Sequence, residues 1–277
     1  MSKRSSVDPS MSGSRWQRLS GWVWGLLRDA GELVLPQTCV CRLCRRPLPA
    51  PPLPFACYVN DLYACLCREC IHSLAWVQPP LCPQCGRPWR HGGLCRFCLR
   101  RRHVLQGCSP LVYTGAAQEL VRELKFRAVC ELGRPLGYII GAMVRSAMPD
   151  WEPQAIIPVP LHADRLAARG YNQAELLSQG VSHFLKKPLL HQALLRTRHT
   201  QPQSALSVTE RVKNVHAAFH VPHPAVVANK RLLLVDDVHT TGATVHAAAS
   251  ALWHAGATTV RFATLAVAAN TADLSER

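Results

Sequence analysis

The sequence of 277 residues has no long apolar run and no convincing secretory leader. A membrane-spanning helix needs roughly 18 or more apolar residues, and no uninterrupted run approaches that length. The only apolar core near the N-terminus, Trp22–Leu27, is short and is followed by Arg28 and Asp29. We therefore expect a cytoplasmic protein without a transmembrane segment; a peripheral position at the inner face of the membrane is the alternative.

Acidic residues are scarce in the first 110 residues, which hold five Asp and Glu against 15 Lys and Arg. The remaining residues hold 12 against 17, and the formal net charge of the chain is +15. A surface of this sign suits a polyanion, with nucleic acid first and anionic lipid second. A basic surface without a specific partner is the alternative.

Cysteine, in contrast, is abundant, and all but one of the 13 cysteines lie between Cys39 and Cys108. Eight of them form four C-x-x-C pairs. In a cytosolic chain this density indicates metal binding rather than disulfides, and four repeats make a redox role less favoured. Two C-x-x-C turns supply four thiolates, which complete a tetrahedral structural zinc site.

The spacing divides these cysteines into two candidate zinc sites. The turns CPQCGRP and CRFC are typical of a zinc ribbon and supply Cys82, Cys85, Cys95 and Cys98. The other site comprises Cys41, Cys44, Cys67 and Cys70. Its pairs are 22 residues apart and other cysteines lie close by, so crossed ligation stays open. We expect one or two structural zinc ions in a module over residues 39–108.

The segments outside this module differ in composition. Residues 1–12 are polar and predict a disordered tail. Residues 15–35 carry apolar side chains at helical spacing and predict an amphipathic helix that ends at Pro36. We favour packing of this helix against the protein itself over a membrane surface. Within the module, several arginines predict a cationic face: Arg87, Arg90, Arg96, Arg100, Arg101 and Arg102.

Strand and helix patterns alternate over residues 109–270, which predicts an α/β domain. We expect strands at 111–113, 155–159, 231–238 and 259–267. We expect helices at 116–126, 135–146, 170–185 and 245–255. This order predicts a mainly parallel sheet with a ligand site at the carboxyl ends of its strands.

The most specific motif is RLLLVDDVHTTGAT, at Arg231–Thr244. An apolar strand stops at Asp236 and Asp237, and a tight loop then leads into an Ala-rich helix. Backbone N–H groups at a helix N-terminus favour an anion, and the loop threonines add hydroxyl donors. Hydrogen-bond donors for a phosphate, placed beside two acids, indicate a phosphorylated sugar as ligand.

Two more segments add candidate ligand groups. In IPVPLHADRLAARGYNQAELL a strand, a basic loop and a helix are expected, and Arg165 and Arg169 offer guanidinium groups to a pyrophosphate. Gly170 opens the turn, and Asn172 and Gln173 cap the helix or bind ligand. The segment Arg196–Phe219 is rich in polar donors, including Gln203 and Ser204, and predicts a mobile loop that closes over a ligand.

The motif VDDVHTTGAT resembles the phosphoribosyl pyrophosphate signature of type I phosphoribosyltransferases. The resemblance implies that Asp236 and Asp237 face the ribose hydroxyls. It also implies that the 5-phosphate is held by a loop of five residues: Thr240, Thr241, Gly242, Ala243 and Thr244. Within this loop region we expect His239 at a solvent-facing, variable position; a sensor of phosphate charge is the alternative.

Together with the zinc ribbon and LKFRA at 124–128, these segments resemble the ComF family of competence-associated proteins, over most of the chain. The resemblance implies an N-terminal zinc finger fused to a phosphoribosyltransferase domain. It implies that the pyrophosphate side of the pocket is lined by Lys125, Arg165, Arg169 and Asn172.

The same resemblance implies a protein that binds phosphoribosyl pyrophosphate with Mg²⁺ and handles single-stranded DNA in natural transformation or DNA utilisation. Two alternatives stay open. The chain is an active phosphoribosyltransferase on a nucleobase or amine, or its ribbon is a docking surface for a competence helicase without direct DNA contact.

Overall fold

The computed structural model describes residues 40–48, 62–100, 105–126, 130–197 and 218–269. These ranges belong to one compact unit, Val40–Arg277. The expected tail at 1–12, the expected helix at 15–35, and Gln203 and Ser204 lie outside them. Within the described ranges, no helix has the length and apolar character needed to cross a membrane.

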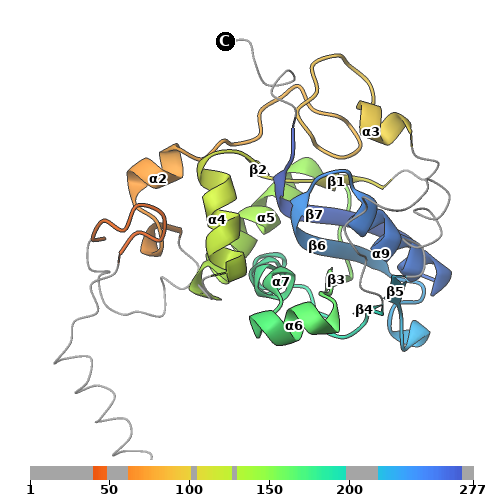
Figure 1. Cartoon of the computed structure of the whole chain (residues 1–277). Helices are drawn as coiled ribbons and strands as arrows, with labels where there is room; N and C mark the ends of the chain where they lie inside the picture. Colours follow the sequence, from red (N-terminus) through yellow and green to blue (C-terminus); the bar gives the residue numbers. More distant parts are fainter. Residues whose placement is uncertain (1–39, 49–61, 101–104, 127–129, 198–217, 270–277) are drawn as a thin grey trace, which may run out of the picture. The chain divides into compact units, whose positions relative to one another are not determined.

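A parallel β-sheet forms the centre of the unit (Figure 1). Strand β6 (Arg231–His239) lies between β3 (Ala155–Pro158) and β7 (Thr259–Val267). The other edge of β7 pairs with β1 (Gly107–Cys108) and β2 (Leu111–Val112). All pairings in this sheet are parallel, which confirms the expected sheet type.

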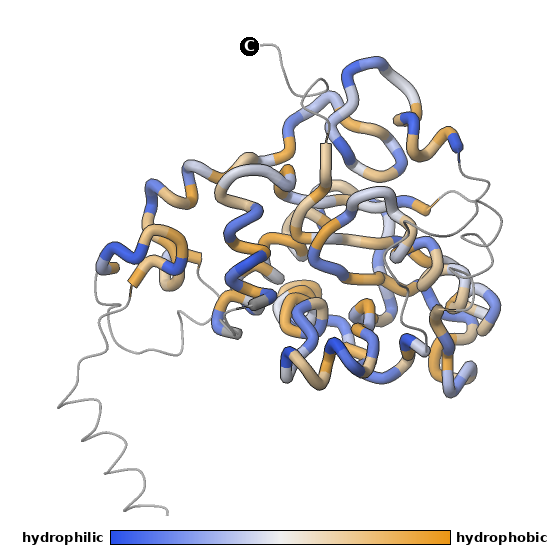
Figure 2. The backbone as a smooth tube through the Cα atoms, viewed as in Figure 1, coloured by the Kyte–Doolittle hydropathy of each residue, from blue (hydrophilic) through white to orange (hydrophobic). Residues whose placement is uncertain are grey.

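Helices cover both faces of the sheet. Leu233 and Val235 of β6 belong to an apolar cluster with helices α4 (Ala116–Phe126), α5 (Gly133–Ala147) and α7 (Gln173–Leu185). The alternate residues Leu232 and Leu234 belong to a second cluster with α9 (Ala243–His254). A strand buried on both faces requires such a continuous apolar run, and Figure 2 shows apolar residues along the central strands.

Helices α5 and α7 cross at two glycines, Gly137 and Gly180. A Cβ atom on Gly137 would lie 2.2 Å from the carbonyl oxygen of Leu177 and 2.8 Å from Cα of Gly180. The absence of side chains therefore allows this close approach. The crossing fixes the N-terminal end of α7 beside the carboxyl ends of the strands.

The segment expected as a basic loop after β3 contains a helix, α6 (Ala163–Arg169). Gly170 ends α6 with a φ of 82°, and Asn172 caps the start of α7, so the predicted helix at 170–185 begins three residues late. Helix α6 has no buried residue, so it carries no apolar stripe that would predict it.

A short antiparallel pair, β4 (Leu195–Arg196) and β5 (Phe219–His220), closes the ends of the loop expected at 196–219. The interior of that loop, residues 198–217, lies outside the described residues. Short 3₁₀ turns complete the unit: η2 (Leu62–Ala64), η3 (Cys130–Leu132) and η4 (Pro224–Val226).

The cysteine-rich region contains two modules with the same local design. In the first module, residues 40–48 and 62–73, the turn CRLCRRP precedes helix α2 (Arg68–His72); in the second module, residues 81–100, the turn CPQCGRP precedes α3 (Arg96–Leu99). The residue after each C-x-x-C has a positive φ, 63° at Arg45 and 65° at Gly86. This correspondence identifies an internal repeat that the spacing of cysteines alone did not predict.

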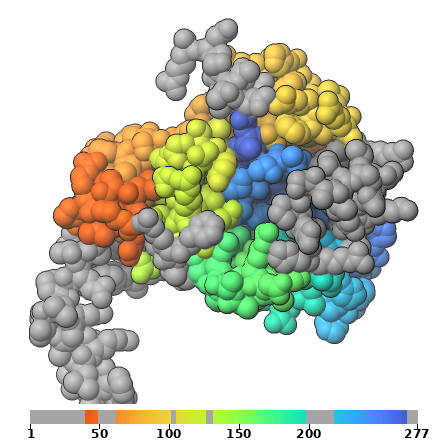
Figure 3. Space-filling view, in the orientation of Figure 1, coloured from red at the N-terminus to blue at the C-terminus, as the bar shows by residue number. Residues whose placement is uncertain are grey.

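The two modules pack at different places on the sheet domain, as their separate patches in Figure 3 show. Cys41 and Cys70 of the first module join the apolar cluster that contains α4 and α5. Cys82, Cys85 and Cys95 of the second module join the cluster that contains α9. Each module is therefore continuous with one layer of the α/β core.

Candidate functional site

A cavity of about 730 Å³ lies at the carboxyl end of β6. Its lining comes from α4, α6, α7, the β4 strand and the loop between β6 and α9. Eight of the residues predicted from the sequence line this cavity: Lys125, Arg165, Arg169, Gln173, Asp236, Asp237, Thr240 and Thr244. Residues that are far apart in the sequence thus meet in one place, as expected for the carboxyl edge of a parallel sheet.

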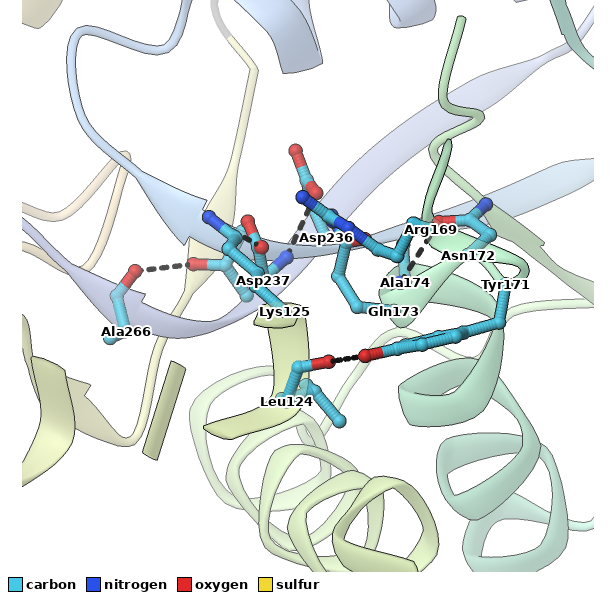
Figure 4. Close-up of polar contacts among 11 residues, drawn as sticks. Leu124, Lys125, Arg169, Tyr171, Asn172, Gln173, Ala174, Asp236, Asp237 and Ala266 are labelled. Carbon is cyan, nitrogen blue, oxygen red and sulfur yellow. Dashed lines mark hydrogen bonds and ion pairs between the residues drawn. The ribbon is translucent and has the colours of Figure 1, made fainter. Parts of the chain in front are cut away.

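The two acids form a buried part of the cavity wall (Figure 4). The backbone N–H of Asp237 donates to Oδ1 of Asp236 at 2.8 Å, and Nζ of Lys125 lies 2.8 Å from Oδ2 of Asp237. Burial, and then the charge of Asp237, raise the pKa of Asp236 to about 8. Asp236 therefore holds a proton at neutral pH until a cation approaches it.

Lys125 occupies the last turn of α4, and a hydrogen bond fixes that turn. The hydroxyl of Tyr171 donates to the carbonyl oxygen of Leu124 at 2.6 Å, as Figure 4 shows. This bond joins the end of α4 to the segment that precedes α7. It explains why the LKF stretch and the GYN stretch, which are distant in sequence, contribute to the same cavity.

Three arginines also line the cavity. Arg165 and Arg169 project from α6, and Arg169 donates to Oε1 of Gln173. Arg196, on β4, was not predicted as a site residue although it opens the polar segment at 196–219; its guanidinium lies 5.4 Å from the centre of the Phe219 ring. Burial lowers the pKa of Arg196. With Lys125, these cations outnumber the two acids, so the cavity favours an anion.

The loop after β6 leads directly into a helix N-terminus. Helix α9 begins at Ala243, directly after Gly242, which adopts a left-handed φ of 80°. Thr240 and Thr244 line the cavity, whereas the Thr241 hydroxyl accepts from the N–H of Ala243 at 3.4 Å. The helix N-terminus and the threonine hydroxyls therefore converge on one end of the cavity.

Some predicted site residues have a structural position beside the cavity. Asn172 is buried, accepts from the N–H of Ala174 at 3.1 Å and donates to the carbonyl oxygen of Val159 at 3.1 Å. It therefore caps α7 and is not among the lining residues. Gly170 ends α6. Tyr113 and Tyr171, which the sequence did not single out, complete the lining.

The eight cysteines form the two predicted groups, and in each group all four sulfurs lie within 4.8 Å of one another. The Sγ atoms of Cys44 and Cys67 are 3.6 Å apart, and those of Cys85 and Cys95 are 3.7 Å apart. Zinc–sulfur bonds of roughly 2.3 Å in a tetrahedron give sulfur separations of about 3.8 Å, whereas a disulfide needs about 2.05 Å. Both groups therefore fit zinc.

The ionisation of the second group also suits a cation. A hydrogen bond with Cys98 most strongly lowers the pKa of Cys85, to about 3, and the same contact raises the pKa of Cys98. The backbone N–H of Cys95 also donates to Sγ of Cys82 at 3.4 Å. Negative charge and protons are thus shared unevenly among the thiols, and a bound dication would replace the protons.

The expectation for His239 was wrong. Strand β6 continues past the acids to His239, whose side chain is buried at 3% exposure. Its ring lies 4.7 Å from the ring of Phe262 and close enough to Cys85 to lower the pKa of that thiol. The reason is that pairing between β6 and β7 extends to His239 and Val267, so the side chain follows the strand into the core.

The cationic face predicted on the second module is smaller than expected. Arg90, Arg96 and Arg100 are exposed, whereas Arg87 is buried at 3% exposure. Arg101 and Arg102 lie outside the described residues. The buried position of Arg87 follows from its contacts with the sheet domain, which are described below.

The family model "Phosphoribosyl transferase domain" matches residues 173–276, which include the two acids and the phosphate loop. The chain is 34% identical to DNA utilization protein YhgH of Salmonella typhimurium over 80% of this chain and 94% of that protein. It is 35% identical to competence protein F of Haemophilus influenzae over 65% of this chain and 81% of that protein.

A solved structure, the glutamine phosphoribosylpyrophosphate amidotransferase of Bacillus subtilis, is similar at 17% identity and a TM-score of 0.38, over 58% of this chain and 32% of that one. The parallel sheet, the acid pair and the matched domain define a phosphoribosyltransferase-type α/β protein with two four-cysteine groups. The long alignments with YhgH and competence protein F place the chain in the ComF family.

Proposed function

We propose that this chain binds phosphoribosyl pyrophosphate with Mg²⁺ and handles single-stranded DNA in DNA uptake or utilisation. The observation that carries the first half is the meeting of the acid pair, the phosphate loop and the cations around one cavity. The names of the relatives, which refer to competence and to DNA utilization, support the second half.

The cavity suggests how the ligand lies. The 5-phosphate accepts from the N–H groups and hydroxyls of the loop at Thr240–Thr244, and the ribose hydroxyls face Asp236 and Asp237. The pyrophosphate then points toward Arg165, Arg169 and Lys125. Arg196 adds a further donor on this side. This orientation pairs each anionic group of the ligand with cations or with a helix N-terminus.

The donor set also suits Mg²⁺. Carboxylate and phosphate oxygens are the ligands that Mg²⁺ prefers, and Asp236 and Asp237 present carboxylates at the cavity wall. When bound, Mg²⁺ would offset the charge of the pyrophosphate and, in a transferase, the charge that develops as it leaves. The arginines and Lys125 would orient the same oxygens.

The second module supports contact with single-stranded DNA. Arg90, Arg96 and Arg100 are exposed there and supply cations for phosphates. Trp76, with 37% exposure, shares a groove with Arg90 and offers a ring on which a base stacks. Each zinc with four thiolates carries a charge of about −2, so these peripheral arginines are needed for a net attraction.

The test is calorimetric titration of the zinc-loaded protein with phosphoribosyl pyrophosphate and Mg²⁺, with and without single-stranded DNA. We expect binding in both titrations, and salt-sensitive DNA binding in a separate one. No phosphoribosyl pyrophosphate binding at all would refute the ligand assignment. If no DNA binding is detected at low salt, the DNA role is refuted. That result would favour the alternative in which the cysteine module is a docking surface for a helicase partner.

Turnover distinguishes the remaining alternative. The protein, phosphoribosyl pyrophosphate and Mg²⁺ are incubated with each nucleobase and with simple amines, and pyrophosphate release is followed. Release above the protein-free control would support an active phosphoribosyltransferase. The Asp236→Asn variant with Asp237→Asn is the matched control, because it keeps the shape of the cavity but removes both carboxylate charges.

A further inference from the structure

We propose that the second cysteine module is a structural part of the phosphate loop, and that Arg87 and His239 are the positioning residues that join them. On this proposal, the metal-binding module sets the geometry of the loop at Thr240–Thr244 and therefore its affinity for a sugar phosphate. The consequence for affinity rests on the proposed function, whereas the consequence for loop order does not.

Arg87 joins the module to the ends of two strands. It follows the Cys82–Cys85 turn and is buried. Its guanidinium donates to the carbonyl oxygen of Thr240, in the loop, and to that of Ala268, directly after β7. The same guanidinium lies 4.5 Å from the centre of the Phe97 ring, between the two cysteines of the module's helix. One side chain thus contacts Phe97 of the module, the loop and the residue that follows β7.

His239 makes a second link from the opposite direction. Its ring lies beside Cys85, and the backbone N–H of Ala268 donates to the carbonyl oxygen of His239 at 2.9 Å. A Cβ atom on Gly242 would lie only 2.7 Å from Cε1 of His239. The imidazole therefore lies directly under the left-handed turn of the loop, and it touches a cysteine ligand at the same time. Residues that orient metal ligands from behind commonly act in this way.

The backbone of the module is attached to the sheet as well. The N–H of Gly107, in β1, donates to the carbonyl oxygen of Gln84 at 2.8 Å. A Cβ atom on Gly86 would lie 3.0 Å from the carbonyl oxygen of Gly107, so the turn and the strand are in close contact. The Cys82–Cys85 turn therefore has a fixed position relative to β1, and Arg87 extends from that position to the loop.

The internal repeat supplies a comparison inside the same molecule. Arg46 occupies the position in CRLCRRP that Arg87 occupies in CPQCGRP. The Arg46 side chain is 59% exposed, and it contacts Cys44, Cys67 and Glu69 of the first module. The two arginines occupy equivalent positions in their modules. Arg87 contacts Thr240 and Ala268 of the sheet domain, whereas Arg46 contacts residues of its own module.

The physical effect on ligand binding follows from these contacts. The carbonyl of Thr240 is held by a charged donor. On the proposed function, the residues that follow Thr240 bind the 5-phosphate of the ligand. Loss of that donor lets the peptide rotate, so the loop must be ordered again when the phosphate binds. The cost appears as lower affinity for the phosphate end of the ligand, and not for its pyrophosphate end.

The experiment compares Arg87→Ala, Arg87→Lys and Arg46→Ala with the wild type, all with zinc content measured. Amide hydrogen exchange is recorded for residues 240–246. Calorimetry is done with ribose 5-phosphate, with pyrophosphate and Mg²⁺, and with phosphoribosyl pyrophosphate and Mg²⁺. We expect faster loop exchange in Arg87→Ala, and about tenfold weaker binding of both sugar phosphates, because hydrogen bonds from charged groups contribute at this level.

Pyrophosphate affinity should stay within about twofold of wild type, Arg46→Ala should behave as wild type, and Arg87→Lys should lie in between, since it keeps one charged donor. Loop exchange in both Arg87 variants equal to that of wild type would overturn the proposal, as would equal effects of Arg46→Ala and Arg87→Ala. If wild-type protein binds no phosphoribosyl pyrophosphate, the proposed function fails, and loop exchange alone decides this proposal. Arg87→Lys serves as the test variant should Arg87→Ala not fold.

Discussion

The Nζ atom of Lys125 lies 2.8 Å from Oδ2 of Asp237, and this ion pair joins the end of α4 to the carboxyl end of β6. The Asp237 side chain is only 7% exposed, and Asp236 is its neighbour. The positive charge of Lys125 therefore offsets the repulsion between two buried neighbouring acids. Lys125 also lines the cavity. We therefore expect the same contact to affect both stability and the proposed ligand binding.

Replacement of Lys125 by Met should destabilise the ligand-free protein. The change leaves Asp237 buried beside Asp236 without its cation, and we expect a loss of about 1–3 kcal/mol in the free energy of unfolding. Urea unfolding of the single variants and of Lys125→Met with Asp237→Asn gives a double-mutant cycle. The double variant should recover most of the loss. Equal loss in single and double variants would show that the ion pair is not the cause.

The raised pKa of Asp236, about 8, predicts a pH dependence of stability. Its ordinary value is 3.8, so between roughly pH 4 and 8 the folded state binds a proton that the unfolded state has released. The contribution of this group to the free energy of unfolding therefore falls as pH rises through that window. Asp236→Asn should remove this slope and stabilise the protein by about 1–3 kcal/mol at pH 8.

Urea unfolding at pH 5.5 and pH 8 measures this effect. The difference in stability between Asp236→Asn and wild type should be larger at pH 8 than at pH 5.5. The same difference at both values would mean that Asp236 is already ionised in the folded protein. Other titrating groups are common to both proteins, so they cancel in the comparison.

The acid pair should control binding of phosphoribosyl pyrophosphate. Asp236→Asn with Asp237→Asn removes the carboxylates that we propose face Mg²⁺ and the ribose, and affinity should fall by about tenfold or more. Circular dichroism should show an intact fold. Asp150→Asn, on an exposed turn away from the lining residues, is the matched control. Unchanged calorimetric affinity in the double variant would refute the site assignment.

Local patterns predicted much of the sheet domain. The helix at Ala116–Phe126 and the strand at Thr259–Val267 have the expected bounds, because periodicity and flanking turn residues decide them locally. The motif at Arg231–Thr244 also gave the strand, loop and helix of the cavity. Helix α6 was missed because its residues are not buried, so no apolar stripe marks it.

Long-range contacts account for the other differences. His239 is buried because the pairing of β6 with β7 extends to His239 and Val267. The local sequence pattern does not specify where this pairing ends. The burial of Arg87 depends on acceptors at Thr240 and Ala268, more than a hundred residues later. Arg196 enters the cavity because β4 pairs with β5 at the far end of a long loop. Each case needs the tertiary structure.

The two cysteine groups predict two zinc ions per chain. Metal analysis of protein purified without chelator should give about two, and Co²⁺ substitution should give thiolate-to-metal absorption for each site. Cys44→Ser with Cys67→Ser should remove one equivalent, and Cys85→Ser with Cys95→Ser the other. Cys108→Ser is the control, since Cys108 is buried in β1 and belongs to neither group. Less than one zinc in the wild type would refute the assignment.

The exposed arginines of the second module should carry part of the DNA affinity. Arg96 and Arg100 lie on and just after helix α3, and both are exposed, so their replacement by Ala should spare the fold. If each neutralises one phosphate of single-stranded DNA, the slope of log affinity against log salt should become shallower by about 1.4. Lys186→Ala with Lys230→Ala removes the same charge from the sheet domain and should leave the slope unchanged.

Equal slopes in the arginine variant and wild type would place the DNA contact elsewhere on the chain. Equal losses in both double variants would show that overall charge, rather than the surface of the second module, attracts DNA.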